Sequence, residues 1–215
     1  MKKFAIVLSG CGVYDGAEIH ESTLSMLAVA RSGHQYQIFA PDIAQHHVIN
    51  HLTGDEMNEE RNVLIESARI ARGNAKPLSE FDPDEYDAIL FPGGFGAAKN
   101  LSDYAFSGGY SKAIPEVADA IKGMHDKNKP IGALCIAPVL LAQVLGEVNL
   151  TIGNDRATIK DLETLGATHI EKTHGELVID KNHKVVTTPC YMLDATITQI
   201  ADGAENVVNA LLKMM

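Results

Sequence analysis

Short, wholly apolar segments, each followed by a turn and a helical pattern, restrict the fold of this chain more than any other feature. Residues 4–8, 88–91 and 131–134 lack polar alternation, which is typical of strands buried on both faces of a parallel sheet. Residues 35–40 predict a further strand, which Pro41 ends. Strands that alternate with helices require parallel pairing and right-handed crossovers. The sequence therefore predicts an α/β fold with an open, mostly parallel sheet and helices on both faces.

Helices are expected between these strands and at the end of the chain. The helical patterns cover residues 18–33, 115–127, 137–145, 157–165 and 197–212. Residues 150–152 predict one more strand that continues the alternation, whereas residues 177–180 and 184–188 predict a β-hairpin around Asn182.

The chain length of 215 residues is compatible with one α/β domain, and we expect a single domain over 1–215. The connection at 42–86 is long, so it is predicted to be a helical insertion with at least one helix that ends near Gly73. The first apolar run is too short for a signal peptide or a membrane span, which predicts a cytosolic protein without a membrane partner.

The charge and the cysteines exclude further classes of protein. There are 28 acidic and 18 basic residues, giving a net charge of −10, so nucleic acid is not an expected partner. Cys11, Cys135 and Cys190 cannot all pair and form no Cys-x-x-Cys unit, which predicts free thiols.

Cys135 is the strongest candidate for chemistry. In Gly132-Ala-Leu-Cys135-Ile-Ala-Pro138 a buried strand runs into a helix, and the cysteine lies at the turn. A thiol there meets the positive end of the helix dipole and backbone N–H groups, which favour a nucleophilic thiolate near neutral pH. The alternative is a buried structural cysteine.

A glycine turn, Pro92 to Gly96, follows another parallel strand and is expected at the same edge of the sheet as Cys135. One N–H group from this turn and one from Ile136 would form an oxyanion hole. The alternative is an ordinary tight turn.

The loop from Ser9 to Gly16 is similar to a dinucleotide-binding loop, and Asp42 could stand for the acid that binds the ribose in such sites. The last glycine of the loop, however, comes one residue too late for the G-x-G-x-x-G motif. We expect it to shape a small-molecule pocket without a cofactor. Glu18 and Glu21 begin the next helix, and either could reach the thiol as a proton carrier. The alternative role for both is charge complementary to the helix dipole.

The histidines carry weaker hypotheses. His47 and His51 are four residues apart and would share a helix face, beside His46, which makes a metal site conceivable. Solvated histidines are the preferred interpretation, and no metal is expected. His174-Gly-Glu176 resembles part of a Cys-His-Glu triad but is interpreted as a surface turn.

Six motifs together resemble the enhancing-lycopene-biosynthesis (ElbB-type) glyoxalases of the PfpI and class I glutamine amidotransferase-like superfamily. They lie at residues 9–21, 50–54, 61–66, 92–101, 135–138 and 187–189, so the resemblance spans nearly the whole chain. It implies a flavodoxin-like fold, a homodimer, and conversion of glyoxal to glycolate without glutathione.

The resemblance also implies site roles. Cys135 is the expected nucleophile and Glu21 its carboxylate, with Glu18 as second choice. The expected oxyanion and substrate-binding residues are Gly93, Gly94, Ile136, Cys11 and Asn100. The thiolate would add to glyoxal as a thiohemiacetal, and Glu21 would move a proton between the carbons to give a thioester that water cleaves.

This chain differs at two places from the motifs of the hydrolases in that superfamily. Ile136 stands where many PfpI-type peptidases have histidine, and Pro189-Cys-Tyr191 stands where amidotransferases have His-x-Glu. Neither peptidase nor glutaminase activity is expected. The rival hypothesis is a non-enzymatic thiol sensor or accessory protein linked to isoprenoid biosynthesis, in which Cys135 is oxidised.

Overall fold

A seven-stranded sheet forms the centre of the computed structural model, which describes residues 1–215. Its strands, in spatial order, are β3 (Ala75–Pro77), β2 (Gln35–Ala40), β1 (Lys3–Val7), β4 (Ala88–Phe91), β5 (Ile131–Leu134), β9 (Val185–Thr188) and β8 (Val178–Asp180). All neighbouring strands are parallel except β8, which pairs antiparallel with β9. The open, mostly parallel α/β sheet and the hairpin predicted from the sequence are confirmed, and so is the flavodoxin-like fold that the resemblance implies.

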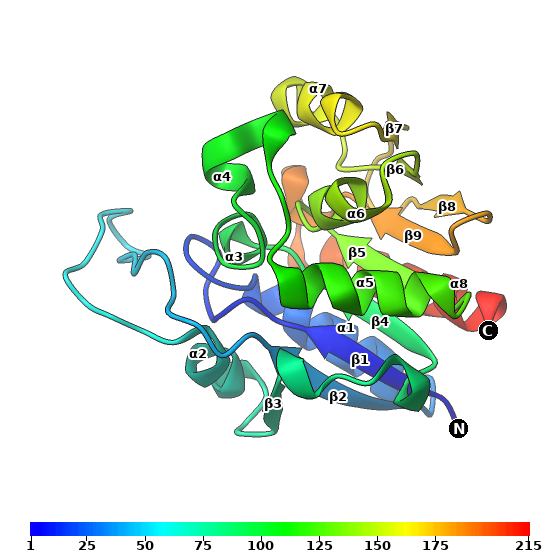
Figure 1. Ribbon diagram of the computed structural model, residues 1–215, viewed down its shortest axis with the longest axis horizontal. Coiled ribbons are helices and arrows are strands. Elements are labelled where there is room, and N and C mark those ends of the chain that lie inside the picture. Colours follow the sequence, from blue (N-terminus) through cyan, green and yellow to red (C-terminus); the bar gives the residue numbers. More distant parts are fainter.

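Helices cover both faces of this sheet, as Figure 1 shows. They are α1 (Ile19–Arg31), α2 (Val63–Ile70), α3 (Phe95–Lys99), α4 (Tyr104–Ser107), α5 (Pro115–Asp126), α6 (Pro138–Leu145), α7 (Arg156–Thr164) and α8 (Ile197–Met214). Single 3-10 turns occur at η1 (Leu78–Glu80), η2 (Pro83–Glu85), η3 (Gly108–Tyr110) and η4 (Cys190–Met192). No helix combines the length and the hydropathy needed to cross a membrane.

Alternating side chains of β1 connect the sheet to two hydrophobic layers. Phe4 and Ile6 pack in the layer that α1 and α8 cover, whereas Ala5 and Val7 pack in the layer of α5 and α6. All four side chains are fully buried. Burial on both faces explains why the strand sequence shows no polar alternation.

The boundaries of the main elements follow from local chemistry. Strands β2, β4 and β5 have the predicted bounds. Glu18 caps α1 by accepting a hydrogen bond from the backbone of Glu21, and Gly33, at φ +77°, follows its end. A capping box of Thr196 and Gln199 begins α8.

The strand expected at residues 150–152 is wrong in its place and length. Only Asn149–Leu150 form a strand, β6, which pairs with β7 (Thr168–His169) in a separate two-stranded sheet. Strand β9 of the hairpin pairs with β5, so it occupies the edge at which the strand expected at residues 150–152 would have joined the main sheet. Asp180 of β8 holds β6 beside the hairpin by accepting hydrogen bonds from the backbone and the side chain of Asn149, both at 2.9 Å.

The segment at 42–86 contains the expected helix, α2, with Gly73 in a left-handed conformation just after it. It also adds the edge strand β3 to the sheet, which the apolar pattern did not predict. The helix face expected for His47 and His51 is wrong. These residues lie on a non-helical loop, because the segment pairs with itself through the bridge between Ile49 and Glu56.

The carboxyl ends of the parallel strands point away from the two chain termini in Figure 1. The loop at 42–62 and the short helices α3 and α4 gather beyond those ends. Ligands of open α/β sheets bind at this edge, so it is where a site is sought.

Candidate active site

Cys135 directly follows β5 and has φ +60°, a conformation that residues with a side chain rarely adopt. Its N–H group donates to the carbonyl of Thr188 at 3.0 Å, which holds the turn against β9. Pro138 then begins α6. Cys135 as a whole residue is 6% exposed. Such backbone strain at the end of a buried strand is characteristic of a functional turn.

Glu21 lies against this thiol although it is fully buried. Its carboxyl accepts hydrogen bonds from the N–H of Gly93 at 2.8 Å and from the N–H of Tyr191 at 3.3 Å. A side chain at Gly93 would lie 2.5 Å from Cβ of Cys135 and 2.8 Å from Oε2 of Glu21. Glycine at position 93 therefore allows the thiol and the carboxyl to meet.

Glu18, the second-choice acid, points elsewhere. Its Oε2 accepts the backbone N–H of Glu21 at 2.7 Å and caps α1. The structure thus brings Glu21 to the thiol and leaves Glu18 as a helix cap.

Burial controls the protonation of Glu21. Burial, followed by the negative charge of Glu18, raises the pKa of this carboxyl, and hydrogen bonds from Gly93, Tyr191 and Cys135 oppose the rise, so that the pKa is about 8. Glu21 is therefore predominantly protonated at neutral pH.

The pKa of Cys135 is also raised, chiefly by burial and then by the charge of Glu21 when that carboxyl is ionised. The N–H groups of Gly94 and Ile136 hydrogen-bond the sulfur and lower its pKa, but by less than burial raises it. The expectation of a thiolate near neutral pH is wrong for this reason. Below about pH 8 Glu21 keeps its proton and Cys135 is a thiol, and as pH rises the carboxyl is the first of the two groups to ionise.

The expected oxyanion donors separate into two groups. The N–H groups of Gly94 and Ile136 point to the sulfur, where an oxygen of a thiol adduct would form. Gly94 has φ +94°, and a side chain there would lie 2.4 Å from the carbonyl of Gly16. Gly93 was expected to contribute as well, but Glu21 already occupies its N–H group.

Asn100 and Cys11 are not at the thiol, which corrects their expected binding role. Asn100 donates to the carbonyls of Ser9 and Asp15, both at 2.9 Å, and accepts from His46, so its amide braces loops and has no free group for a substrate. Cys11 is half-buried, and burial followed by the charge of Glu66 raises its pKa.

The remaining histidine hypotheses are resolved by contacts. His51 accepts the N–H of Tyr14 through Nε2 and donates to the carbonyl of Ile49 through Nδ1. His174 lies in an exposed turn and bonds the carbonyl of Asp194, as expected for a surface turn.

A cavity of about 540 Å³ opens beside Cys135, and several of its residues were not anticipated. Phe95 of α3, Phe106 of α4, and Tyr191 and Met192 of η4 line it. Cys190, at φ +45°, is buried nearby, and burial raises its pKa, followed by the charge of Glu21. The aromatic residues after the glycine turn were a usable signal, but their approach to the thiol depends on the packing of α3 and α4.

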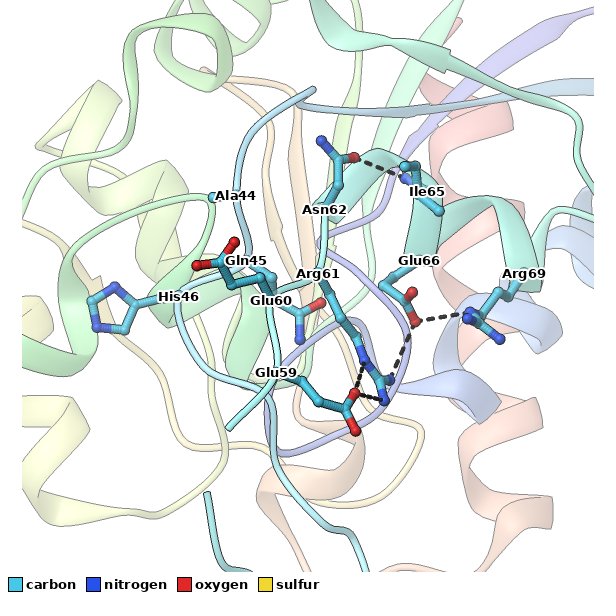
Figure 2. A pocket seen from close by; sticks show the side chains of 10 residues that line it. All are labelled: Ala44, Gln45, His46, Glu59, Glu60, Arg61, Asn62, Ile65, Glu66 and Arg69. Carbon is cyan, nitrogen blue, oxygen red and sulfur yellow. Dashed lines mark hydrogen bonds and ion pairs between the residues drawn. The ribbon is translucent and has the colours of Figure 1, made fainter. Parts of the chain in front are cut away.

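A larger cavity, of about 900 Å³, lies between the loop at 42–62 and α2. Figure 2 shows ion pairs among its charged side chains, including Arg61 with Glu59 at 2.7 Å and Glu66 with Arg69 at 2.9 Å, and no partner for Glu60. It contains neither the thiol nor Glu21. The smaller cavity is therefore the candidate active site, because Cys135, Gly94 and Ile136 line it and the buried carboxyl of Glu21 lies against the thiol.

A cysteine in a strained turn after a strand of a flavodoxin-like sheet is the feature that indicates the class of this protein. Residues 13–194 match the DJ-1/PfpI family, and the chain belongs to that family. The human protein named glutamine amidotransferase-like class 1 domain-containing protein 3, mitochondrial, is 45% identical over 99% of this chain and 83% of its own length. The rat ES1 protein homolog, mitochondrial, is 44% identical over 99% and 84%.

Solved structures give the same fold. An isoprenoid biosynthesis protein with an amidotransferase-like domain from Ehrlichia chaffeensis has a TM-score of 0.94 and 31% identity over 100% of this chain and 99% of its own. Glyoxalase III from Candida albicans has a TM-score of 0.62 and 16% identity over 97% of each chain, which shows the fold alone.

The expected cytosolic location is contradicted by these relatives, whose names place them in mitochondria. Excluding a secretory signal and a membrane span does not distinguish the cytosol from the interior of an organelle.

The raised pKa of Glu21 makes a prediction about stability. Between the unfolded pKa and about 8 only the folded state keeps this proton, so the free energy of unfolding falls as pH rises, by about 1.4 kcal/mol per unit. Glu21→Gln carries no charge and should escape this loss. In urea unfolding at pH 5, 6.5 and 8, the free energy of unfolding of the variant should increase relative to that of the natural protein as pH rises. A pH-independent difference would contradict a buried, protonated carboxyl.

Proposed function

We propose that this protein is a cofactor-independent glyoxalase that converts glyoxal and water to glycolate. The observation that supports this proposal is the fully buried carboxyl of Glu21, with a pKa of about 8, against the thiol of Cys135. A carboxyl that gains and loses a proton near neutral pH is suited to acid–base chemistry on carbon and oxygen.

The reaction begins when the ionised carboxyl of Glu21 takes the proton of the Cys135 thiol, which gives a thiolate beside a neutral Glu21. The thiolate of Cys135 attacks one aldehyde carbon, and the carbonyl electron pair moves to oxygen. The N–H groups of Gly94 and Ile136 stabilise this oxyanion. Glu21 then protonates it, which gives a thiohemiacetal and leaves a carboxylate.

The same carboxylate completes the conversion. It removes the C–H proton beside sulfur to form an enediolate, and returns that proton to the neighbouring carbon while the hydroxyl proton of the thiohemiacetal passes to the neighbouring oxygen, which leaves a thioester of glycolate. Glu21 then accepts a proton from water as the water attacks the thioester. The C–S bond breaks, glycolic acid leaves, and the thiolate and neutral Glu21 are restored.

The contacts of the thiol favour this chemistry over hydrolysis of peptides or glutamine. Thiol hydrolases use an imidazole as the base of their nucleophile. Here a carboxyl takes that position, Ile136 follows the thiol, and His20 shares a hydrogen bond with the Tyr191 hydroxyl at 2.8 Å. We therefore propose neither a peptidase nor a glutaminase.

The direct test is glycolate production from glyoxal by the purified protein without glutathione. We expect turnover that Cys135→Ala abolishes, because no nucleophile remains. Cys11→Ala is the matched control and should keep its activity, since Cys11 does not line the cavity. Absence of turnover, with Cys135 readily oxidised to sulfinic acid, would instead support the thiol-sensor alternative.

The two glutamates should respond differently to loss of charge. Glu21→Gln cannot carry a proton, so we expect kcat to fall about 10²- to 10⁴-fold. Glu18→Gln keeps an oxygen that can cap α1, and should keep its maximal rate. Because the charge of Glu18 raises the pKa of Glu21, this variant should shift the rising limb of the kcat/KM profile to lower pH. A large loss of maximal rate in Glu18→Gln would contradict these roles.

We also propose a homodimer, on the family resemblance alone. Sedimentation at micromolar protein concentration should give a dimer mass. A monomer mass would exclude this proposal without bearing on the chemistry.

A further inference from the structure

The cavity beside Cys135 is much larger than glyoxal requires. Its volume of about 540 Å³ falls within the range of about 300–1,000 Å³ that is typical of sites for drug-sized ligands. Ten of its 14 lining residues are hydrophobic. A two-carbon dialdehyde would leave most of this apolar space unused.

The site geometry decides which part of a substrate occupies the space. Glu21 is fully buried on the inner side of the thiol, so substrate approaches Cys135 from the cavity. Once the aldehyde carbon meets the sulfur and its oxygen meets the N–H groups of Gly94 and Ile136, the other substituent must remain in the cavity. There it meets the aromatic side chains of Phe95 and Phe106.

The polar groups in the wall are already engaged within the protein. The Tyr104 hydroxyl donates to Asp161 at 3.1 Å, and the Tyr191 hydroxyl shares a hydrogen bond with His20 at 2.8 Å. A polar substituent would therefore gain little from them, whereas an apolar one would be removed from water.

The charges of the wall balance. Lys99 and Asp155 are its two charged residues. Lys99 donates to the carbonyl of Tyr14 at 3.0 Å, and Asp155 caps α7 by accepting from Thr158 at 2.9 Å. An uncharged substituent fits this lining better than an anion or a cation.

We propose that the preferred substrate is an α-oxoaldehyde with an aromatic or branched apolar substituent; this rests on the proposed glyoxalase function. Phenylglyoxal represents the class. The thiolate adds to its aldehyde carbon, the C–H proton moves to the ketone carbon through Glu21, and water cleaves the thioester. Phenylglyoxal and one water thus become mandelate, with no external oxidant or reductant.

The first experiment compares kcat/KM for phenylglyoxal and glyoxal, with the Cys135→Ala rate subtracted. We expect phenylglyoxal to be favoured at least about tenfold, the low end of what one added hydrocarbon group contributes in an apolar pocket. A ratio of one or less, with glyoxal turned over, would overturn the substrate class and leave the proposed function standing.

A variant that fills the cavity tests the same inference. Ala105 lines the cavity from an exposed position on α4, so Ala105→Trp should cut the ratio of the two kcat/KM values at least about tenfold while the fold survives. Ala30→Trp is the matched control, because Ala30 is an exposed alanine on α1 outside the cavity. An unchanged ratio in Ala105→Trp would place the substituent elsewhere.

Binding of the reaction products tests the apolar preference of the cavity independently of catalysis. Calorimetric titration should show mandelate binding at least about tenfold more tightly than glycolate, and Ala105→Trp should remove the difference. If neither aldehyde is turned over, the proposed function fails, and this titration alone decides the apolar preference. Equal binding of the two acids would overturn it.

Discussion

The burial of one carboxyl beside one thiol is the constraint on which the site depends. Glu21 has no exposed surface, so the charged form is disfavoured and its pKa rises to about 8. Three separate parts of the fold make this possible: the turn after β5 presents Cys135, the first turn of α1 supplies Glu21, and Gly93 leaves the space between them.

The same burial determines which chemistry is accessible. It suppresses a free thiolate at neutral pH. In the proposed reaction the thiolate forms when the ionised carboxyl of Glu21 takes the proton of Cys135, so the thiol and the carboxyl act as one proton-sharing pair. Such a pair can deliver a proton to oxygen and then remove one from carbon, which a permanently charged carboxylate could not do. In the proposed reaction, the cavity on the outer side of the thiol then determines which substituent the substrate carries besides its reacting carbons.

Much of the fold was predictable because the decisive signals are local. The apolar runs of β4 and β5 and the β-rich segment of β2 that ends at Pro41 predicted the bounds of these strands, and the short segment around Cys135 predicted the turn. Strand β6 was misplaced because its position depends on a contact with Asp180, 31 residues away. The loop histidines were misread because a spacing of four residues predicts a shared face only where a helix forms.

The sequence was sufficient to predict most residues of the site, but not whether those residues are protonated. Cys135, Glu21, Gly94 and Ile136 meet as expected, whereas Asn100 braces loops and Cys11 lies away from the cavity. The hydrogen bonds to Glu21 come from residues 72 and 170 positions later in the chain. Local sequence cannot show whether such distant groups bury a carboxyl or leave it in water.

The protonation of Glu21 is the central claim, and infrared difference spectroscopy measures it directly. Spectra of the natural protein minus Glu21→Gln, recorded across pH, should contain the C=O stretch of a neutral carboxylic acid at pH 7. That band should give way to a carboxylate band near pH 8. A carboxylate band that persists down to pH 5 would show that Glu21 is ionised beside the thiol, and would contradict the proton-sharing pair.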